Sequence, residues 1–347
     1  AEEWSVIEAG LVQRAELLNL ILADIYGPQQ LLQAGLLPPE LVFGHAGFQR
    51  SCVGTIPAGK RSLIICSSNL AHGPDGRMWV IDDRAQSPSG AGYALENRMV
   101  MTRIAPVLFR DCHVRRLAGF FQPMRDRLAQ LAPQNRDDPR IVVLTPGPYS
   151  PSYFEHAYLA NYLGYTLVQG DDLSVRDGWV WLKSLEGLHQ VDVLHRRGED
   201  AYCDPLELRE DSRLGVTGLL QSARLGHVAI ANPIGSCVLE NPGLLAFLPG
   251  IAKHFFAEDL KLPSVATWWC GQENERRFVL ENLDKLVIKT IHRSRGYRAI
   301  FGAQLTAAEQ DELRARIQHK PHLYTGQEMV SFSTAPSLVD GRVEPRH

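Results

Sequence analysis

The chain has 347 residues, of which 45% are hydrophobic and 22% charged, and its formal net charge is −3. These values are typical of soluble globular proteins, and the length predicts about two or three structural units. Lys and Arg together number 36 against 39 Asp and Glu, which argues against a nucleic-acid partner. The apolar runs are far shorter than the roughly 20 residues that span a bilayer, so we expect no membrane partner either.

The six cysteines are scattered along the chain, and no two of them are closer than 14 positions. This spacing excludes a CxxC zinc or redox pair. Isolated cysteines in a long chain are usually small buried apolar residues, which is typical of a reducing compartment. We therefore expect a cytoplasmic protein.

The first elements are predicted to be helices and a β-hairpin. Apolar residues at helical spacing predict a helix over residues 4–26. Residues 62–67 and 77–81 are predicted to be strands joined by a tight turn at residues 73–76. A Ser/Gly-rich loop then leads into an amphipathic helix over residues 93–109.

Strands and helices alternate in the middle of the chain. After a helix and a polar break at 132–139, the expected strands are 141–144, 166–169, 178–182, 191–195 and 227–231. The expected helices between them are 154–163 and 214–225. This alternation predicts a mostly parallel sheet and an α/β fold. A third region begins near residue 276, with expected strands at 286–289, 297–301 and 323–332 and a helix at 307–318.

Acidic side chains lie at one end of the predicted hairpin. Asp82 and Asp83 come directly after the strand 77–81, and Asn69 follows the neighbouring strand. Because paired strand ends bring oxygen atoms together, these residues are candidates for binding Mg²⁺. The alternative is that the two aspartates are ordinary surface residues.

Two segments are candidates for binding phosphate. Ser89 and Gly90 precede a helix whose free backbone N–H groups can meet an anion, and Arg98 lies in its first turns. Lys289 ends a strand and is followed by a basic turn at residues 292–296, which suits a polyphosphate. The alternatives are an ordinary capped helix and a solvent-exposed hairpin tip.

Charged residues also follow the strand 191–195, at the end where open α/β sheets bind ligands. The adjacent Arg196 and Arg197 suit a carboxylate or a phosphate, and a structural loop held by salt bridges is the alternative. The motifs GxSxG, HExxH, GxxxxGK[ST] and GxGxxG are absent from the sequence. Their absence argues against the commonest hydrolases, zinc proteases, P-loop proteins and dinucleotide-binding proteins.

Several longer motifs, read in order, resemble a known family. They are WSVIEAGLVQRAELLNLILADIYGPQQLLQAGLLPPELV, PSGAGYALENR, LTPGPYSPSYFEHAYLANYLGY, DPLELREDSRLGVTGLL and PSVATWWCGQ. They resemble the circularly permuted ATP-grasp family of bacterial proteins, which is distantly similar to glutathionylspermidine synthase. The resemblance covers nearly all of the chain, and because family members usually extend beyond both ends, we expect a fragment of a longer protein.

The resemblance implies a fold and an order of domains. It implies a circularly permuted ATP-grasp fold with a Rossmann-like pre-ATP-grasp domain. Residues 1–131 would hold the N-terminal helices and the metal-binding ATP-grasp subdomain, and residues 139–275 the pre-ATP-grasp domain. Residues 276–347 would form the ATP-grasp lid, incomplete at its C-terminus.

The resemblance also implies roles for the candidate residues. The residues implied to bind Mg²⁺ are Asp83, Asp82 and Asn69. Those implied for catalysis, by reaching or holding the phosphates, are Arg84, Arg98 and Lys289. Those implied to bind ATP are Lys289, Gly296, Gln327, Glu328, Ser89 and Gly90. Those implied to line the acceptor substrate are Arg196, Arg197, Asp204 and Arg209.

The implied activity is ATP-dependent carboxylate–amine ligation, in which an acylphosphate is converted to an amide or peptide bond. The expected partners are ATP, Mg²⁺ and small carboxylate and amine substrates, with amino acids or peptides as natural candidates. A catalytically impaired relative that binds a nucleotide or a partner protein is the alternative, because Asn69 and His72 replace the Asp and Arg of the family pattern. A kinase-like phosphotransferase is a third hypothesis, and the sequence gives no signal for the oligomeric state.

Overall fold

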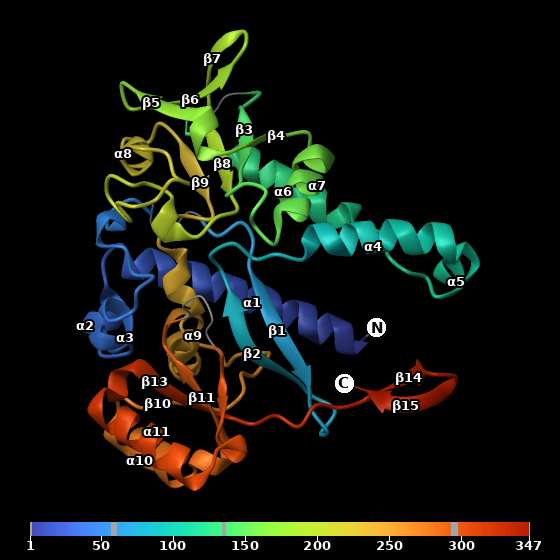
Figure 1. Cartoon of the computed structure of the whole chain (residues 1–347), viewed down its shortest axis with the longest axis vertical. Helices are drawn as coiled ribbons and strands as arrows, with labels where there is room; N and C mark the ends of the chain where they lie inside the picture. The colour runs from blue at the N-terminus through green and yellow to red at the C-terminus, as the bar shows by residue number, and fades with distance from the viewer. Residues whose placement is uncertain (1, 57–60, 134–136, 293–297, 347) are drawn as a thin grey trace. The chain divides into compact units, whose positions relative to one another are not determined.

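The structure is a computed structural model that describes residues 2–56, 61–133, 137–292 and 298–346 (Figure 1). The chain forms two compact units, each built from separate stretches of sequence. Unit 1 consists of Ala1–Phe48, Ser67–Arg84 and Val238–His347, and unit 2 consists of Gln49–Cys66 and Ala85–Cys237. The three continuous domains expected from the sequence therefore differ from these compact units, and their functional labels remain predictions.

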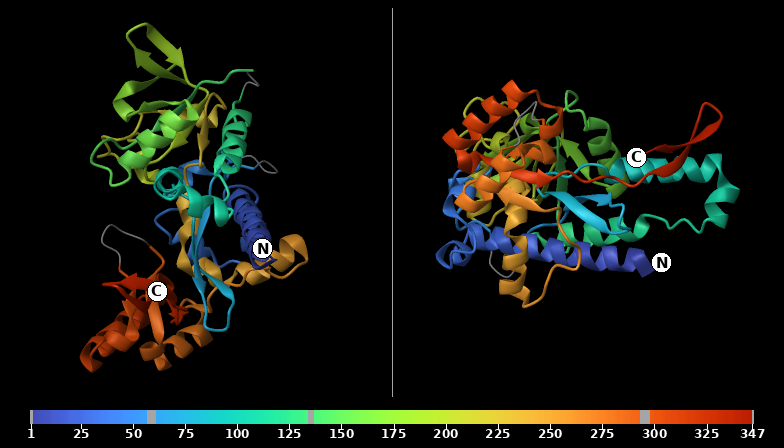
Figure 2. Two further views of the ribbon diagram at one scale, coloured as in Figure 1. Left: turned by 90° about the vertical axis from the view of Figure 1, so that its right-hand side faces the viewer. Right: turned by 90° about the horizontal axis from the view of Figure 1, so that it is seen from below.

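In its described residues, unit 1 combines helices with three small antiparallel sheets. Its helices are α1 (Glu2–Ile25), α2 (Gln30–Gln33), α3 (Pro39–Phe43), α9 (Leu248–Phe256), α10 (Glu273–Glu281) and α11 (Ala307–His319). Its strands are β1 (Ser67–His72), β2 (Met78–Arg84), β10 (Thr267–Trp269), β11 (Leu286–Thr290), β12 (Ile300–Phe301), β13 (Tyr324–Glu328), β14 (Ala335–Val339) and β15 (Arg342–Arg346). The largest sheet has the order β10-β13-β11-β12, while β1 pairs with β2 and β14 with β15. The two strands β1 and β2 run alongside α1, as the views in Figure 2 show.

Unit 2 is an α/β unit around a parallel sheet. Its helices are α4 (Ala91–Ile104), α5 (Pro106–Asp111), α6 (Ala118–Gln130), α7 (Tyr153–Leu163) and α8 (Leu219–Arg224). Its strands are β3 (Ile141–Leu144), β4 (Thr166–Val168), β5 (Leu173–Arg176), β6 (Trp179–Ser184), β7 (Gly187–Gln190), β8 (Val193–Arg196) and β9 (Ala229–Ala231). The sheet β4-β3-β8-β9 is parallel, as the alternating pattern predicted, and β5-β6-β7 is a separate antiparallel sheet.

Each unit has its own apolar core. In unit 2, the fully buried Leu128 of α6 and the buried Leu163 of α7 pack with Val193 of the parallel sheet. In unit 1, Val279 of α10 and Ile317 of α11 pack against Ile288 of β11. None of the helices in the described parts of the chain is long and apolar enough to cross a membrane.

The predicted hairpin is present, but its first strand was misplaced. The expected strand 62–67 is wrong, because β1 begins at Ser67 and pairs with β2 through residue His72. The apolar run at 62–66 lies before the strand, where Asn232 Oδ1 accepts hydrogen bonds from the backbone of Ile64 and Ile65. As a result, Asn69, Asp82 and Asp83 lie within paired strands rather than beyond their ends.

Several other boundaries differ for physical reasons. The expected helix 93–109 is two helices, since Pro106 cannot continue α4 and instead begins α5. The expected helix 214–225 begins only after Gly218, which has a left-handed conformation. The expected strand 323–332 ends at Glu328, and the hairpin of β14 and β15 was not anticipated.

Candidate functional site in unit 1

The central sheet of unit 1 brings Lys289 and Gln327 together. In the antiparallel pair of β11 and β13, Lys289 lies opposite Thr325, so Gln327 is its diagonal neighbour on the same face. The Lys289 ammonium donates a hydrogen bond of 2.5 Å to Gln327 Oε1, and both side chains are buried. The lysine and the glutamine, 38 positions apart in sequence, therefore act as one buried polar pair.

Gln327 connects this pair to the acidic strand. Its Nε2 donates to the backbone carbonyl of Ile81 at 3.0 Å and to Thr267 Oγ1 at 3.2 Å. Ile81 directly precedes Asp82 on β2. A continuous line of hydrogen bonds thus runs from Lys289 through Gln327 to the strand that carries both aspartates.

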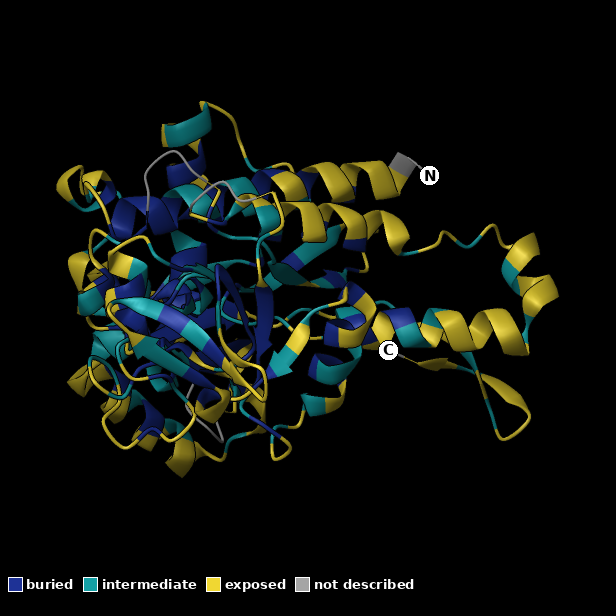
Figure 3. Cartoon of the chain, turned by 90° about the horizontal axis from the view of Figure 1, so that it is seen from above, coloured by how far each residue is buried: buried dark blue, intermediate teal, exposed yellow. Residues whose placement is uncertain are grey.

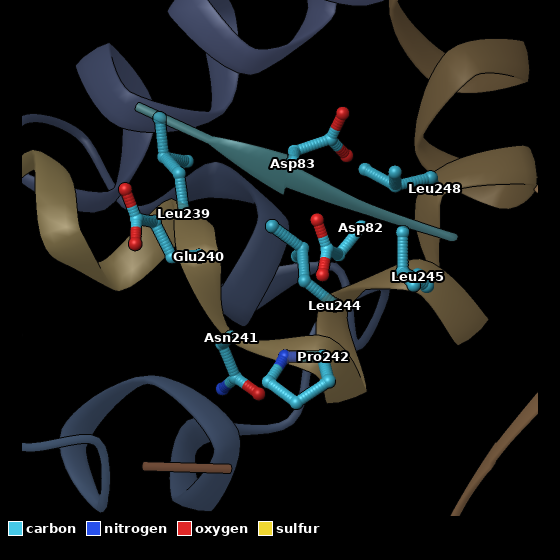
Figure 4. A pocket seen from close by; sticks show the side chains of 9 residues that line it. All are labelled: Asp82, Asp83, Leu239, Glu240, Asn241, Pro242, Leu244, Leu245 and Leu248. Carbon is cyan, nitrogen blue, oxygen red and sulfur yellow. The ribbon is translucent and has the colours of Figure 1, made fainter. Parts of the chain in front are cut away.

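Asp82 and Asp83 point to opposite faces of β2, as expected for neighbours on a strand (Figure 4). Asp83 is buried, and its two oxygens accept hydrogen bonds of 2.8 and 2.9 Å from Nε of the buried Arg14 of α1. A third donor, Ser68 Oγ, lies 2.6 Å from Asp83 Oδ1. Because the guanidinium of Arg14 neutralises this carboxylate, the expected role of Asp83 as the principal Mg²⁺ ligand does not fit its surroundings.

Asp82 faces a shallow pocket that it shares with Glu240. The pocket is lined by Asp82, Asp83 and residues of the segment 239–248, Glu240 among them, and Figure 4 labels these side chains. Arg84 lies beside both acids, with Nε 3.8 Å from Asp82 Oδ1 and Nη1 3.8 Å from Glu240 Oε2. Asn69, opposite Asp82 in the hairpin, donates to Asp82 Oδ1 at 2.6 Å.

These groups are of the chemical kind that holds a magnesium ion completed by a nucleotide. Mg²⁺ in phosphate-transfer sites usually has one or two carboxylate ligands, several waters and phosphate oxygens. Asp82 and Glu240 supply two carboxylates at one pocket. Within the described residues no group of three or more His, Cys, Asp or Glu side chains could hold a metal ion, so a purely protein-made metal cage is not found there.

Two residues of this site were missed by the sequence interpretation. Arg14 occupies the apolar stripe of the first helix, between Leu11 and Leu18, and a charge on such a stripe requires a buried partner. That pattern is a usable signal for Arg14. Glu240 ends a short 3-10 helix, Ser236–Glu240, and no pattern in the local sequence predicts its position beside Arg84.

The remaining expected residues of unit 1 are in different situations. Glu328 ends β13 and is exposed, and its backbone N–H donates to Ala266. His72 Nδ1 shares a hydrogen bond of 2.8 Å with Ser333 Oγ, and His72 Nε2 lies 3.8 Å from Glu3 Oε1. Gly296, expected in the phosphate-covering turn, lies outside the described residues.

Polar groups of unit 2

The loop before α4 is closed by a carboxylate of the protein itself. Gly90 and Gly92 donate their backbone N–H groups to Glu155 Oε1 at 2.7 and 2.9 Å, and Glu155 is fully buried. Gly92 permits this contact, since a Cβ there would lie 2.7 Å from Cγ of Glu155. The N–H groups expected to meet a phosphate therefore already bind an anion, while the Ser89 side chain next to them is exposed.

Arg196 and Arg197 are both buried but have different partners. Arg196 forms an ion pair of 2.6 Å with the buried Asp200 and donates to backbone carbonyls, including those of Gln86 and Asn232. These contacts match the alternative of a salt-bridged structural loop. Arg197 instead donates to the Pro88 carbonyl at 2.7 Å, and its Nη2 lies 3.9 Å from Glu155 Oε2.

Asp204 caps a helix from outside that helix. Its buried carboxylate accepts hydrogen bonds from the backbone N–H of Gly218 at 3.1 Å and Leu220 at 2.9 Å, at the start of α8, and from Leu206 at 2.9 Å. Arg209 is exposed and pairs with Asp211, and its guanidinium lies 4.7 Å from the Tyr202 ring centroid. Neither environment resembles a recessed substrate site.

These two residues give a matched test of stability. Replacing Asp204 with Ala should lower the free energy of unfolding by about 1–3 kcal/mol, because buried N–H donors of α8 lose their acceptor. Arg209→Ala should leave the urea midpoint unchanged, since its partners are solvated. A smaller shift for Asp204→Ala than for Arg209→Ala would contradict the capping role.

Two buried histidines lie near the ends of β3 and β8. His156 shares a hydrogen bond of 2.9 Å with Thr145 Oγ1, and His195 lies within β8. Burial, reinforced by the nearby charge of Arg197, lowers the pKa of His156 to about 4 and that of His195 to about 3. Both rings are therefore neutral in the folded protein at neutral pH.

These depressed pKa values predict acid sensitivity. An unfolded histidine has a pKa near 6.5, so below this pH the unfolded chain binds protons that the folded chain excludes. The stability is fully present above about pH 6.5 and should fall between about pH 6.5 and 4, by up to about 1.4 kcal/mol per pH unit for each histidine. Urea unfolding at several pH values checks this, and a His156→Gln variant with an unchanged slope would contradict it.

Arg98 belongs to α4 of unit 2. Its Nη1 donates to the backbone carbonyl of Arg115 at 2.8 Å, which ties α4 to the segment before α6. Arg98, Ser89, Gly90 and Arg197 all belong to unit 2, whereas Lys289, Gln327 and the acidic strand belong to unit 1.

Comparison with known proteins

The mixture of helices and sheets is consistent with an ATP-grasp fold in permuted order. The chain belongs to the family described as circularly permuted ATP-grasp type 2, whose model matches residues 1–347. This finding confirms the family resemblance and the fold class predicted from the sequence.

Bacterial relatives of the chain are longer than it is. The uncharacterized protein Rv2567 of Mycobacterium tuberculosis is 42% identical over 337 residues, which are 97% of this chain and 38% of that protein. The uncharacterized protein sll0335 of Synechocystis is 36% identical over 345 residues, which are 99% of this chain and 72% of that protein. The chain thus spans well under half of the mycobacterial relative.

A solved structure has a similar fold. It is that of a glutathione synthetase like-effector from Globodera pallida in its apo form, with a TM-score of 0.57 and 13% sequence identity. The match covers 97% of this chain and 74% of the effector. At this identity the similarity concerns the fold alone.

Proposed function

We propose that the protein is an ATP-dependent carboxylate–amine ligase whose nucleotide and Mg²⁺ bind to unit 1. Membership of the ATP-grasp family supports an ATP-dependent, ligase-like function in general. The observation that carries the proposal is the hydrogen-bonded line from Lys289 through Gln327 to the backbone of the strand bearing Asp82. It joins a buried cation to an acidic strand, the two features that a magnesium–nucleotide complex requires.

Each group has a distinct role in this proposal. The Lys289 ammonium binds the phosphates of ATP, and its buried position strengthens that attraction. Asp82 and Glu240 hold Mg²⁺, which neutralises phosphate charge when bound. Arg84, between these acids, neutralises the transferred phosphate, and Gln327 and Glu328 at the end of β13 meet the adenine.

The proposed reaction has two steps. A carboxylate oxygen of the acid substrate attacks the γ-phosphorus of ATP, forming an acylphosphate and releasing ADP. The amine then attacks the acyl carbon, the bond to phosphate breaks, and the amine loses a proton as the amide forms. The protein contributes orientation and charge neutralisation in both steps.

In unit 2 we propose Arg197 as a contact for an anionic substrate group. The ATP-binding role implied for Ser89 and Gly90 rests on the family resemblance alone, and the Gly90 N–H already donates to Glu155. Arg197 is preferred to Arg196 because it holds the loop that contains Ser89, whereas Arg196 is committed to Asp200. The proposed roles of Arg98 and Gly296 in phosphate binding rest on the family resemblance alone.

A trapping experiment tests the reaction type. Panels of amino acids and small dicarboxylates are incubated with ATP, Mg²⁺ and hydroxylamine, which converts an acylphosphate to a stable hydroxamate. A ligase yields hydroxamate and free phosphate only with a suitable acid, and with an amine it yields amide and free phosphate. A phosphorylated product that resists hydroxylamine, with no free phosphate, would instead indicate a kinase-like transferase.

A nucleotide-binding protein without turnover is the second candidate, and Asn69 favours it. The Asn69 amide occupies an oxygen of Asp82 where the family pattern has a carboxylate. In an Asn69→Asp, His72→Arg variant, the new carboxylate would repel Asp82, so Mg²⁺ should raise the melting temperature more than it does in the parent. Gain of ATP turnover in this variant, with none in the parent, would favour the second candidate over the ligase.

A further inference from the structure

An exposed apolar surface lies on the arm of unit 2, which we define as residues 91–117 and which includes α4 and α5. Figure 3 shows the outer part of α4 and α5 as largely exposed. The large apolar side chains exposed there are Tyr93, Met99, Val100, Met101, Ile104, Val107 and Leu108. Ile104 is 73% exposed and Leu108 60%. Large apolar side chains exposed together on one segment are typical of interaction surfaces.

The arm is also strongly basic. It carries five arginines and only two acidic residues, Glu96 and Asp111, while the whole chain has a net charge of −3. The arginines are Arg98, Arg103, Arg110, Arg115 and Arg116. Positive charge is therefore concentrated on the same stretch that exposes apolar side chains.

The arm contains a concave surface rather than a flat one. A groove of about 460 Å³ is lined by Leu95, Arg98, Met99, Arg103, Phe109 and Arg116, among others. Leu95 belongs to the buried core of unit 2, so the floor of the groove is anchored. The hydrogen bond from Arg98 to the Arg115 carbonyl fixes one wall against the other.

We propose that this groove docks an amphipathic helix of a partner polypeptide, with acidic residues beside its apolar face. An apolar helix face inserted into a hydrophobic groove is a common mode of peptide recognition, and Arg pairs well with carboxylates at a rim. α4 has 14 residues, enough for about three to four turns of a partner helix to lie along it. The positive charge selects an acidic partner over a basic one.

The same features disfavour two other occupants. Pairing the arm with the same surface of a second copy would place arginines against arginines, and like charges across an interface are costly. A bilayer surface would meet the rim, but side chains at the floor of a concave groove, such as Leu95, would not reach it.

Labelled peptides of about 18 residues, long enough to form a helix, test the proposal. One peptide has leucine at helical spacing flanked by glutamates, the second replaces the glutamates with lysines, and the third scrambles the first. Fluorescence anisotropy at low salt should detect the glutamate peptide at least tenfold more tightly than either control. Raising the salt should weaken this binding, because the charges are at the surface.

Variants assign the binding to the groove. Arg103→Glu with Arg116→Glu, and separately Met99→Ser with Phe109→Ser, all at residues that line the groove, should each reduce affinity at least tenfold. Matched controls at exposed positions of the β5–β7 sheet, Arg176→Glu and Leu185→Ser, should not. Circular dichroism confirms that each variant remains folded.

Several results would overturn the proposal. The glutamate and lysine peptides could bind equally well, or no peptide could bind. The control variants could also lose as much affinity as the groove variants. Self-association that Met99→Ser with Phe109→Ser abolishes would assign the groove to a second copy. Binding to vesicles with 30% anionic lipid, without peptide binding, would assign the arm to membranes.

Discussion

Replacing Asp83 with Ala is expected to destabilise unit 1 by about 3–5 kcal/mol. The substitution leaves the guanidinium of Arg14 buried without its counter-charge, and a buried unpaired charge is strongly destabilising. The loss should appear as a large decrease in the urea midpoint, followed by circular dichroism. The family resemblance implies a role for Asp83 in binding Mg²⁺, and the buried ion pair adds a structural role to it.

The hairpin offers a matched control for this substitution. Asp75 also pairs with an arginine, Arg77, but both side chains are exposed, so Asp75→Ala should leave the midpoint unchanged. The double variant Arg14→Met, Asp83→Leu removes both charges and should recover much of the lost stability. If Asp83→Ala unfolds at the same urea concentration as Asp75→Ala, the ion pair does not stabilise unit 1 as described.

Replacing Lys289 with Gln is expected to weaken binding of Mg²⁺–ATP by about 10- to 150-fold. Hydrogen bonds to charged groups contribute about 1.5–3 kcal/mol, and the ammonium supplies both the donor and the charge. Glutamine keeps a donor for Gln327 Oε1, so the fold should be retained. Isothermal titration with a non-hydrolysable ATP analogue and Mg²⁺ measures the change.

Lys285 provides the comparison for Lys289. It lies four positions earlier, is exposed, and directly precedes the same strand. Lys285→Gln should leave the affinity for Mg²⁺–ATP within about twofold of that of the parent, because the charge of an exposed lysine is screened by water and salt. Equal losses in the two variants would mean that general positive charge, and not the buried lysine, governs nucleotide binding.

The parallel sheet and the long helices were predictable because their signals are local. The apolar run 141–144 coincides with β3, and the helical stripe of the first segment coincides closely with α1. The first strand of the hairpin was not predictable, because the segment 62–66 is as apolar as a true strand although β1 begins only at Ser67. They are held instead by the distant Asn232, whose side chain receives their backbone hydrogen bonds.

The candidate site was predictable in its residue types and less so in its pairings. Lys289, Gln327 and Asp82 were singled out from the sequence and its resemblance to a family, and the structure joins the first two directly. The partner of Asp83 is Arg14, 69 positions away, and no local pattern connects them. Long-range pairing of this kind decides which of the two adjacent aspartates is neutralised by an arginine, and a strand pattern alone cannot distinguish them.

Thermal unfolding with and without Mg²⁺ and a non-hydrolysable ATP analogue tests the central claim most directly. A ligand that binds only the folded state at 100 times its dissociation constant stabilises it by about 2.7 kcal/mol. We expect the midpoint to rise by a few degrees when nucleotide and Mg²⁺ are both present, and by much less with either alone or with the Lys289→Gln variant. An unchanged midpoint for the folded chain with both ligands at millimolar concentration would contradict a nucleotide site built on Lys289, Asp82 and Glu240.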